Sequence, residues 1–215
     1  MAALLLPPRD LVSKPDPDDP IDYYYRPFTA PLYRARLRDA LTLLGPGPFD
    51  ALLDVGYGSG VFLPELARRT KRLVGIDVHE GRAGVEAMAE AMGIQADLRN
   101  ESLFDLPFAD GEFAALVSVS VLEHLRDLDA ALTELSRVVA PGGRVVLGVP
   151  VRNAATSSFF RLVGYDPLEI HPSSHRDVAA ALARRPELQV ERRLVFPRVL
   201  PFDLAAYVTF GCRRA

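Results

Sequence analysis

Two acidic residues end two apolar segments of this chain, and a glycine-rich turn follows the first of them. The segment LeuLeuAspValGlyTyrGlySerGly (52–60) carries one acid, Asp54, and three glycines at alternating positions, Gly56, Gly58 and Gly60. The apolar residues 51–55 predict a strand buried on both faces, and the residues after the glycines predict a helix with Pro64 in its first turn. Glycines let the backbone turn sharply and let a ligand lie directly against it. The stretch therefore predicts a ligand-binding turn.

The residues around the glycines indicate which ligand the turn accepts. A dinucleotide-binding turn usually reads G-x-G-x-x-G, so that a pyrophosphate lies on the helix N-terminus. Here the third glycine comes one residue early and Val61 stands in its place. The carboxylate of Asp54 disfavours a pyrophosphate and favours a ligand with an ammonium or sulfonium charge. S-adenosylmethionine carries both of these charges.

A second acid stands at the end of the next apolar segment. Asp77 ends the segment ArgLeuValGlyIleAsp (72–77), 23 residues beyond Asp54. A carboxylate at about this distance accepts hydrogen bonds from ribose hydroxyls in nucleotide-binding α/β folds. The plainer interpretation is an ordinary tight turn and a helix N-cap. The two motifs in register favour a nucleoside-containing ligand.

Five motifs between Phe49 and Asn153, in one order, resemble those of the class I S-adenosylmethionine-dependent methyltransferases, especially the small-molecule and quinone-biosynthesis type. They are LeuLeuAspValGlyTyrGlySerGly, GlyIleAspVal, LeuProPheAlaAspGlyGluPhe (106–113), ValLeuGluHisLeu (121–125) and ArgValValAlaProGlyGlyArgValVal (137–146). The resemblance implies a cofactor site at the end of the first strand. The cofactor-binding residues expected are Asp54, Gly56, Tyr57, Gly58 and Gly60 for the methionine end, Asp77 and Val78 for the ribose, Ser102 and Leu103 for the adenine, and Ser118 and Val119 beside them.

This chain departs from the family pattern at three positions. The family usually has Gly-Asp before LeuProPhe, and the Asp binds the adenine amino group; here the pair is Glu101-Ser102. Ser102 can accept that hydrogen bond, or Glu101 can do so after a small register shift. Ala114 stands where the family often has Asp, which we interpret as a tolerated change at a strand start. Tyr57 replaces the usual small residue between the first two glycines and is expected to line the pocket.

Strands and helices are expected to alternate along the rest of the chain. After the first two strands we expect a helix at 82–92, strands at 94–98 and 114–120, a helix at 127–139 that ends at ProGlyGly, a strand at 144–149, a helix at 174–184, and strands at 188–196 and 204–213. Such alternation implies a parallel sheet with right-handed crossovers. With the family resemblance, the expected fold is α/β, a Rossmann-like doubly wound seven-stranded sheet that is mostly parallel, with an antiparallel C-terminal strand.

The expected organisation is one domain with an N-terminal extension. We divide the chain into an arm and cap helix at 1–48 and a cofactor-binding domain at 49–215. In the family, the N-terminal helices and the insertions after strands four and five cover the methyl acceptor. The corresponding segments are Tyr23 to Leu44 and Val151 to His175, where the sequence is least informative about the substrate.

Three histidines are the candidates for catalysis. A sulfonium is already an activated methyl donor, so methyl transfer needs mainly alignment and exclusion of water, with a base only if the acceptor holds a proton. His124 follows strand four beside Glu123, and His171 and His175 belong to the segment HisProSerSerHis. The alternatives are that His124 packs over the cofactor or caps a short helix, and that Ser173 or Ser174 is the N-cap of the next helix.

The N-terminal segment TyrTyrTyrArgProPhe (23–28) is rich in aromatic residues. Aromatic rings can form a lid and offer cation–π contacts to a sulfonium, whereas the plainer interpretation is packing on the core. Arg34, Arg36 and Arg38 follow on a helix that carries leucines. They could contact an anionic membrane surface or an acidic substrate, but a solvated basic face is the simpler interpretation.

Composition excludes several other classes. A net charge of −3 offers no broad field for nucleic acid, so such substrates are disfavoured. Cys212 is the only cysteine, and four scattered histidines form no HExxH pattern, so neither an intrachain disulfide nor a metal is expected. No apolar run approaches the roughly 20 residues needed to cross a membrane, and the start of the chain lacks a signal-peptide pattern. A cytoplasmic location is therefore expected.

These observations favour a methyltransferase (EC 2.1.1.-) that uses S-adenosyl-L-methionine on a small or lipid-like acceptor. A nucleotide-dependent oxidoreductase would share the fold, but the early third glycine and Asp54 disfavour it. A non-catalytic cofactor-binding relative stays open because of the changes at Ser102 and Ala114. The oligomeric state and the atom methylated do not follow from the sequence.

Overall fold

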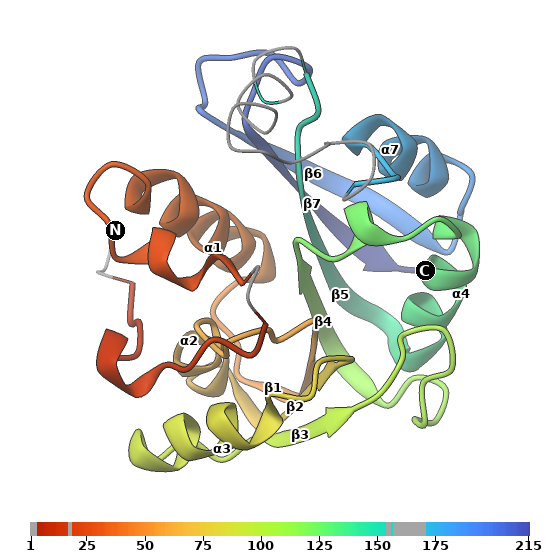
Figure 1. Cartoon of the computed structure of the whole chain (residues 1–215). Helices are drawn as coiled ribbons and strands as arrows, with labels where there is room; N and C mark the ends of the chain where they lie inside the picture. Colours follow the sequence, from red (N-terminus) through yellow and green to blue (C-terminus); the bar gives the residue numbers. More distant parts are fainter. Residues whose placement is uncertain (1–3, 17–18, 154–155, 157–170) are drawn as a thin grey trace.

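A single twisted sheet runs through the computed structural model, with helices on both faces (Figure 1). The structure describes residues 4–16, 19–153, 156 and 171–215. Its strands are β1 (Phe49–Val55), β2 (Thr70–Asp77), β3 (Asp97–Asn100), β4 (Phe113–Val119), β5 (Val139–Pro150), β6 (Leu188–Phe196) and β7 (Tyr207–Arg214). Their order in the sheet is β3-β2-β1-β4-β5-β7-β6. Only β7 runs antiparallel to its neighbours. The expected seven-stranded, mostly parallel fold is confirmed.

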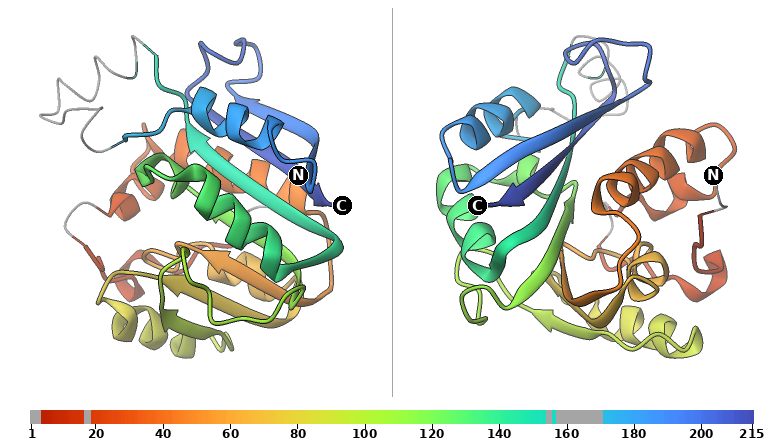
Figure 2. Two further views of the ribbon diagram at one scale, coloured as in Figure 1. Left: turned by 90° about the vertical axis from the view of Figure 1, so that its right-hand side faces the viewer. Right: turned by 180° about the vertical axis from the view of Figure 1, so that it is seen from behind.

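Helices pack on both faces of the sheet (Figure 2). They are α1 (Ala30–Leu44), α2 (Leu63–Ala67), α3 (Arg82–Ala91), α4 (Leu128–Val138) and α7 (His175–Ala183), with short 3-10 helices η1 (Arg9–Leu11), η2 (Pro20–Tyr24) and η3 (Leu122–His124). Side chains of α4 and α7 share one apolar cluster with the sheet, and those of α1, α2 and α3 share the other. Successive side chains of β1 point to opposite faces of the sheet, so Leu53 joins the first cluster and Leu52 joins the second.

Three of the expected strand ranges are wrong. The last strand, β7, begins at Tyr207 and not at residue 204. The third strand covers 97–100 instead of 94–98, because residues 94–96 form the connection after α3. The strand β5 begins directly after α4 at Val139, so ProGlyGly lies inside the strand range and does not form a separate turn. A register shift between Phe113 and Ala115 in the pairing with β4 accommodates this segment.

The N-terminal segment shares its core with the sheet. Ile21, Tyr24, Leu37 and Leu44 are buried in the same cluster as Leu52 of β1. The division at residue 48 therefore stays a prediction about organisation, since the two parts pack together. Within the described ranges, no helix has both the length and the apolar character that crossing a membrane requires.

Candidate cofactor and acceptor site

A cavity of about 380 Å³ lies at the carboxyl ends of β1, β2 and β4. The carboxyl ends of parallel strands, beside the point where strand order reverses, are the usual ligand site of doubly wound sheets. Here the order reverses between β1 and β4. The cavity is lined on one side by the glycine loop and the ends of β1 and β2, and on the other by η2, α1 and the residues after β4.

Asp77 fixes the glycine loop. Its Oδ2 accepts a hydrogen bond from the backbone N–H of Gly58 at 2.8 Å, and its Oδ1 accepts from the N–H of Val78 at 2.7 Å. Gly56 and Gly58 have φ angles of 78° and 51°, a backbone region that favours glycine. Asp77, Val78, Gly56 and Gly58 all line the cavity, as expected. The ribose-binding acid and the glycine loop are therefore one hydrogen-bonded unit.

His79 supports the same loop, a role that the sequence analysis missed. Its Nδ1 accepts a hydrogen bond from the N–H of Gly81 at 3.0 Å, so its Nε2 carries the proton and donates to the carbonyl of Gly58 at 2.9 Å. The ring packs edge-on against Tyr57 at 5.0 Å between centroids. The only signal in the sequence is its place two residues after Asp77.

Gly60 has a packing role that the sequence did not indicate. It does not line the cavity. A Cβ on Gly60 would lie 2.5 Å from Cγ1 of Val85 and 2.7 Å from Cε of Met88, both on α3. The residue also has a φ of 74°. Gly60 therefore allows α3 to pack against the loop, and a contact of Gly60 with the cofactor stays a prediction.

Asp54 presents an unpartnered carboxylate oxygen at the cavity. The residue is 3% exposed, and its Oδ2 has no hydrogen-bond partner among the described residues. Burial, and secondarily the charge of Asp77, raise the pKa of Asp54 to about 7. A buried carboxylate without a partner is unfavourable, so this position is suited to a cationic ligand group.

The segment expected to contact the adenine directly follows β3 and reaches the cavity. Glu101, Ser102, Leu103 and Phe104 all line the cavity. The hydroxyl oxygen of Ser102 accepts a hydrogen bond from the N–H of Phe104 at 3.3 Å. Ser102 and Glu101 therefore both stay candidates for the hydrogen bond from an adenine amino group.

The residues that end β4 differ in their access to the cavity. Val119 lines the cavity, whereas Ser118 does not. Ser118 is 1% exposed, and its hydroxyl has no partner among the described residues. Ser118 thus belongs to the packed strand, and its contact with the cofactor stays a prediction. Tyr57 lines the cavity as predicted and is itself 4% exposed.

Arg36 is a cation on the cavity wall, although the sequence placed it on a solvated face. Its Nε and Nη2 donate to the Tyr24 hydroxyl at 3.0 and 2.6 Å, and its Nη1 donates to the Ser120 hydroxyl at 3.1 Å. The guanidinium carbon lies 4.3 Å from the ring centroid of Tyr33. All its hydrogen bonds within the described residues go to hydroxyl groups, so the charge of Arg36 is available to a ligand carboxylate.

Ser120 joins the two sides of this site. It has a φ of 62°, which is uncommon for a residue other than glycine. Its hydroxyl accepts from Arg36 and lies 2.9 Å from the hydroxyl of Tyr207 on β7. The unusual backbone at the end of β4 thus turns this hydroxyl toward α1 and β7, a feature that no local pattern in the sequence signals.

His124 and His171, two of the three catalytic candidates, lie together. His124 lines the cavity, and its ring centroid is 5.0 Å from that of His171. Burial, and then the neighbouring His124 and Arg152, lower the pKa of His171 to about 4. Glu123 beneath them is 2% exposed, and burial raises its pKa to about 8. His171 itself does not line the cavity.

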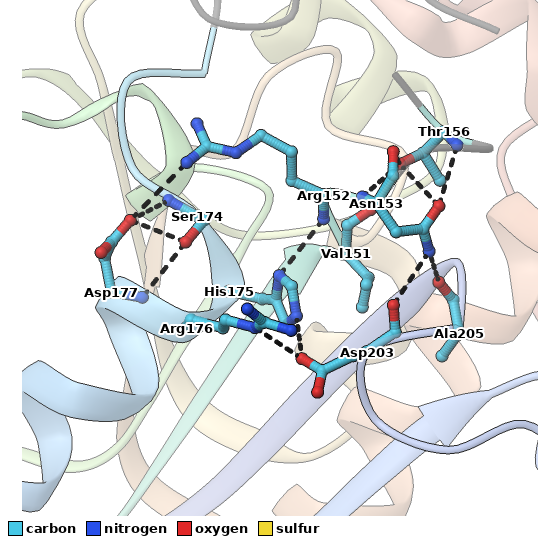
Figure 3. Close-up of polar contacts among 10 residues, drawn as sticks. All are labelled: Val151, Arg152, Asn153, Thr156, Ser174, His175, Arg176, Asp177, Asp203 and Ala205. Carbon is cyan, nitrogen blue, oxygen red and sulfur yellow. Dashed lines mark hydrogen bonds and ion pairs between the residues drawn. The ribbon is translucent and has the colours of Figure 1, made fainter. Parts of the chain in front are cut away.

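His175 is fixed by hydrogen bonds to Arg152 and Asp203 (Figure 3). It is not among the residues that line the cavity, so this geometry does not favour its assignment as a catalytic candidate. Its Nδ1 accepts a hydrogen bond from the N–H of Arg152 at 3.2 Å, and its Nε2 donates to Asp203 at 3.0 Å. Both ring nitrogens are engaged, and the side chain is 1% exposed. Ser174 caps α7, with Asp177 completing a capping box, so the alternative interpretation of this segment is confirmed.

The charges at the cavity and the open backbone of the glycine loop both suit S-adenosylmethionine. Its methionine end carries an ammonium and a carboxylate, and the cavity offers Asp54 to the first and Arg36 to the second. Its ribose hydroxyls suit Asp77 beside a loop whose glycines leave the backbone open. The unpartnered oxygen of Asp54 is the observation that most directly indicates a cationic ligand.

Comparison with known proteins agrees with this geometry. Residues 53–147 match the family model described as a methyltransferase domain. A ubiquinone biosynthesis O-methyltransferase of Dinoroseobacter shibae is 33% identical over 114 residues, which cover 52% of this chain and 46% of that protein. An uncharacterized methyltransferase of a Mycobacterium species is 39% identical over 119 residues, covering 54% and 45%. The chain spans about half the length of the curated relatives it matches.

Solved structures share the fold along nearly the whole chain. A geranyl diphosphate methyltransferase in complex with S-adenosylmethionine superposes with a TM-score of 0.72 at 22% identity, covering 93% of each chain. The N-methyltransferase NodS of Bradyrhizobium japonicum, in complex with S-adenosylhomocysteine, gives 0.69 at 23% identity and covers 94% of each chain. Residues 53–147 are thus similar to methyltransferase domains, and the fold of the described chain is that of these solved methyltransferases.

Proposed function

We propose that this protein transfers the methyl group of S-adenosyl-L-methionine to a small or lipid-like acceptor. The observation that carries the proposal is the buried Asp54 oxygen that lacks a partner among the described residues, in a cavity that Asp77 and Arg36 also line. When bound, the cofactor supplies an activated methyl group on a sulfonium sulfur. The names of the similar proteins support small-molecule acceptors, since they include a ubiquinone biosynthesis enzyme and geranyl diphosphate methyltransferases.

The protein residues would orient the reactants and exclude water. Asp54 and Arg36 would hold the methionine end, Asp77 and Val78 the ribose, and Ser102 and Leu103 the adenine. Leu37, Val121 and Leu125 give the acceptor end an apolar wall. Where the acceptor is a hydroxyl, His124 is the histidine at the cavity that could take up its proton, with His171 behind it. In-line alignment in a water-poor cavity then favours transfer of the methyl group.

Two experiments test this proposal in sequence. Calorimetric titration with S-adenosylmethionine, S-adenosylhomocysteine and NAD should show micromolar binding of the first two and none of NAD. Binding of NAD alone would favour the oxidoreductase alternative. Release of S-adenosylhomocysteine with a panel of hydroxylated aromatic and prenyl acceptors should then show turnover. Cofactor binding without turnover on any acceptor would favour the non-catalytic alternative.

Cofactor affinity should depend on pH through Asp54. In the free protein its pKa is about 7, so the carboxyl is largely protonated at pH 5.5 and must lose its proton to pair with an ammonium. The Kd for S-adenosylhomocysteine should therefore fall by roughly tenfold per pH unit from 5.5 toward 7 and then level off. Calorimetry across this range measures it. Asp54→Asn should bind more weakly and lose the slope; an equal Kd at pH 5.5 and 7.5 in the wild type contradicts the prediction.

Three sequence-based expectations stay proposals beside this function. They are the division at residue 48, the cytoplasmic location, and a peripheral contact with an anionic membrane surface. Arg34 and Arg38 are the residues of α1 left for the last of these, because Arg36 faces the cavity. Sedimentation with anionic vesicles would test the membrane contact, and cell fractionation the location.

A further inference from the structure

Three side chains that commonly bind metal ions converge beside the acceptor end of the cavity. They are Glu123 and His124 of η3 and His171, which precedes α7. One ligand atom from each, a carboxylate oxygen and two imidazole nitrogens, lies within 4.8 Å of the other two. The sequence analysis expected no metal, because these residues do not form a recognised spacing pattern. Only the fold brings His171 close to Glu123 and His124.

The backbone around these residues is held by hydrogen bonds. The N–H of Ser173 donates to the carbonyl of Glu123 at 3.2 Å, and its hydroxyl donates to the carbonyl of Leu125 at 2.5 Å. On the other side, Nη1 of Arg152 donates to the carbonyl of His171 at 3.0 Å. These contacts hold the backbone of His171 against η3. A preorganised set of donors is what a metal site requires.

Glu123 gives a second and independent indication of a cation. Its side chain is 2% exposed, and its Oε2 has no hydrogen-bond partner among the described residues. Burying a carboxylate costs several kcal/mol unless a positive charge or hydrogen bonds compensate it. A cation bound between the carboxylate and the two imidazoles would supply the missing partner.

We propose that Glu123, His124 and His171 bind one divalent metal ion of the zinc type. Two imidazoles and one carboxylate suit Zn²⁺, Mn²⁺, Fe²⁺ or Co²⁺, whereas Mg²⁺ and Ca²⁺ take mainly oxygen ligands. Three protein ligands leave a coordination position for a further group, as in catalytic rather than structural sites. Because His124 also lines the cavity, that position is next to the place of the acceptor.

The ion would bind the acceptor oxygen, a role that rests on the proposed function. An acceptor hydroxyl bound to a divalent cation loses its proton to water more readily. The oxygen then forms its bond to the methyl carbon while the carbon–sulfur bond breaks, and the electron pair of that bond stays on sulfur. In this arrangement the two histidines hold the ion and do not take up the proton. Binding of the ion itself does not depend on methyl transfer.

The test is a titration of the metal-free full chain with Zn²⁺ against a chromophoric chelator. The wild type should bind one equivalent, and Glu123→Gln and His171→Gln should each weaken binding by at least about tenfold. Glu90→Gln, an exposed acid on α3, is the matched control and should bind as the wild type does. X-ray absorption of the wild-type zinc complex should show two imidazole ligands, a result that needs no variant.

Two results would overturn the site: less than a fifth of an equivalent bound by the wild type, or equal affinity in the wild type and both variants. The titration is repeated with S-adenosylhomocysteine, which separates this inference from the function it serves. Zinc binding in a protein that fails to bind S-adenosylhomocysteine would overturn the proposed function and leave the site standing. Cofactor binding without zinc binding would overturn the site alone.

Discussion

Asp77→Ala should raise the Kd for S-adenosylhomocysteine by at least about 30-fold, which corresponds to about 2 kcal/mol. The carboxylate of Asp77 lies at the cavity, where a ribose would donate to it, and hydrogen bonds to charged groups contribute about 1.5–3 kcal/mol each. It also accepts from the N–H groups of Gly58 and Val78, so the alanine leaves the glycine loop without its anchor. Isothermal titration calorimetry at pH 7.5 measures the change.

Asp50→Asn is the matched control for this prediction. Asp50 lies in β1 near the opposite end of the sheet from the cavity, and its exposed carboxylate pairs with Lys71 at 2.7 Å. Exposed ion pairs contribute little to stability, so this variant should bind the cofactor product as the wild type does. If Asp77→Ala binds within threefold of the wild type, the ribose assignment is wrong. Thermal unfolding without ligand shows whether the variant is folded.

Gly60→Ala should lower the free energy of unfolding by about 2–5 kcal/mol. A residue with a Cβ at positive φ costs roughly 1–2 kcal/mol, and overpacking a filled core adds about 1–3 kcal/mol. Both conditions hold at Gly60, where φ is 74° and a Cβ would lie 2.5 Å from Cγ1 of Val85. Urea unfolding, read from the midpoint at constant slope, measures the loss.

Gly93→Ala separates the two contributions. Gly93 has a φ of 65°, close to that of Gly60, but a Cβ there would meet no atom within 4 Å. Its loss should therefore be limited to the backbone part, roughly 1–2 kcal/mol. Equal losses in the two variants would show that contact with α3 is not the reason for glycine at position 60.

The sequence predicted best the residues whose role is set by a local pattern. Asp54 and Asp77 each end an apolar strand, and a parallel sheet brings the ends of neighbouring strands to one edge. The glycine loop was predicted for the same reason. Spacing alone does not separate a glycine that leaves room for a ligand from one that leaves room for a helix, and the second is what the structure shows at Gly60.

The roles of Arg36 and His175 could not be predicted because each depends on contacts between segments distant in sequence. Arg36 lies on a helix whose register looks amphipathic, and its role depends on how α1 packs against β4, β5 and β7. His175 has the residue type of a base, but folding places it between Arg152 and Asp203. Residues 154–155 and 157–170 of the expected acceptor cover lie outside the described residues.

The hydroxyl contact between Ser120 and Tyr207 also bears on the timing of biosynthesis. The strand that carries Tyr207 comes last along the chain, yet it is inserted between β5 and β6. A nascent chain that has exposed everything up to β6 can already form the glycine loop from β1 and β2. It still lacks Tyr207 of β7, which contacts the Ser120 hydroxyl and lies beside Arg36. The part of the cavity formed by the glycine loop should therefore form co-translationally, whereas the part around Arg36 awaits emergence of β7 from the ribosome.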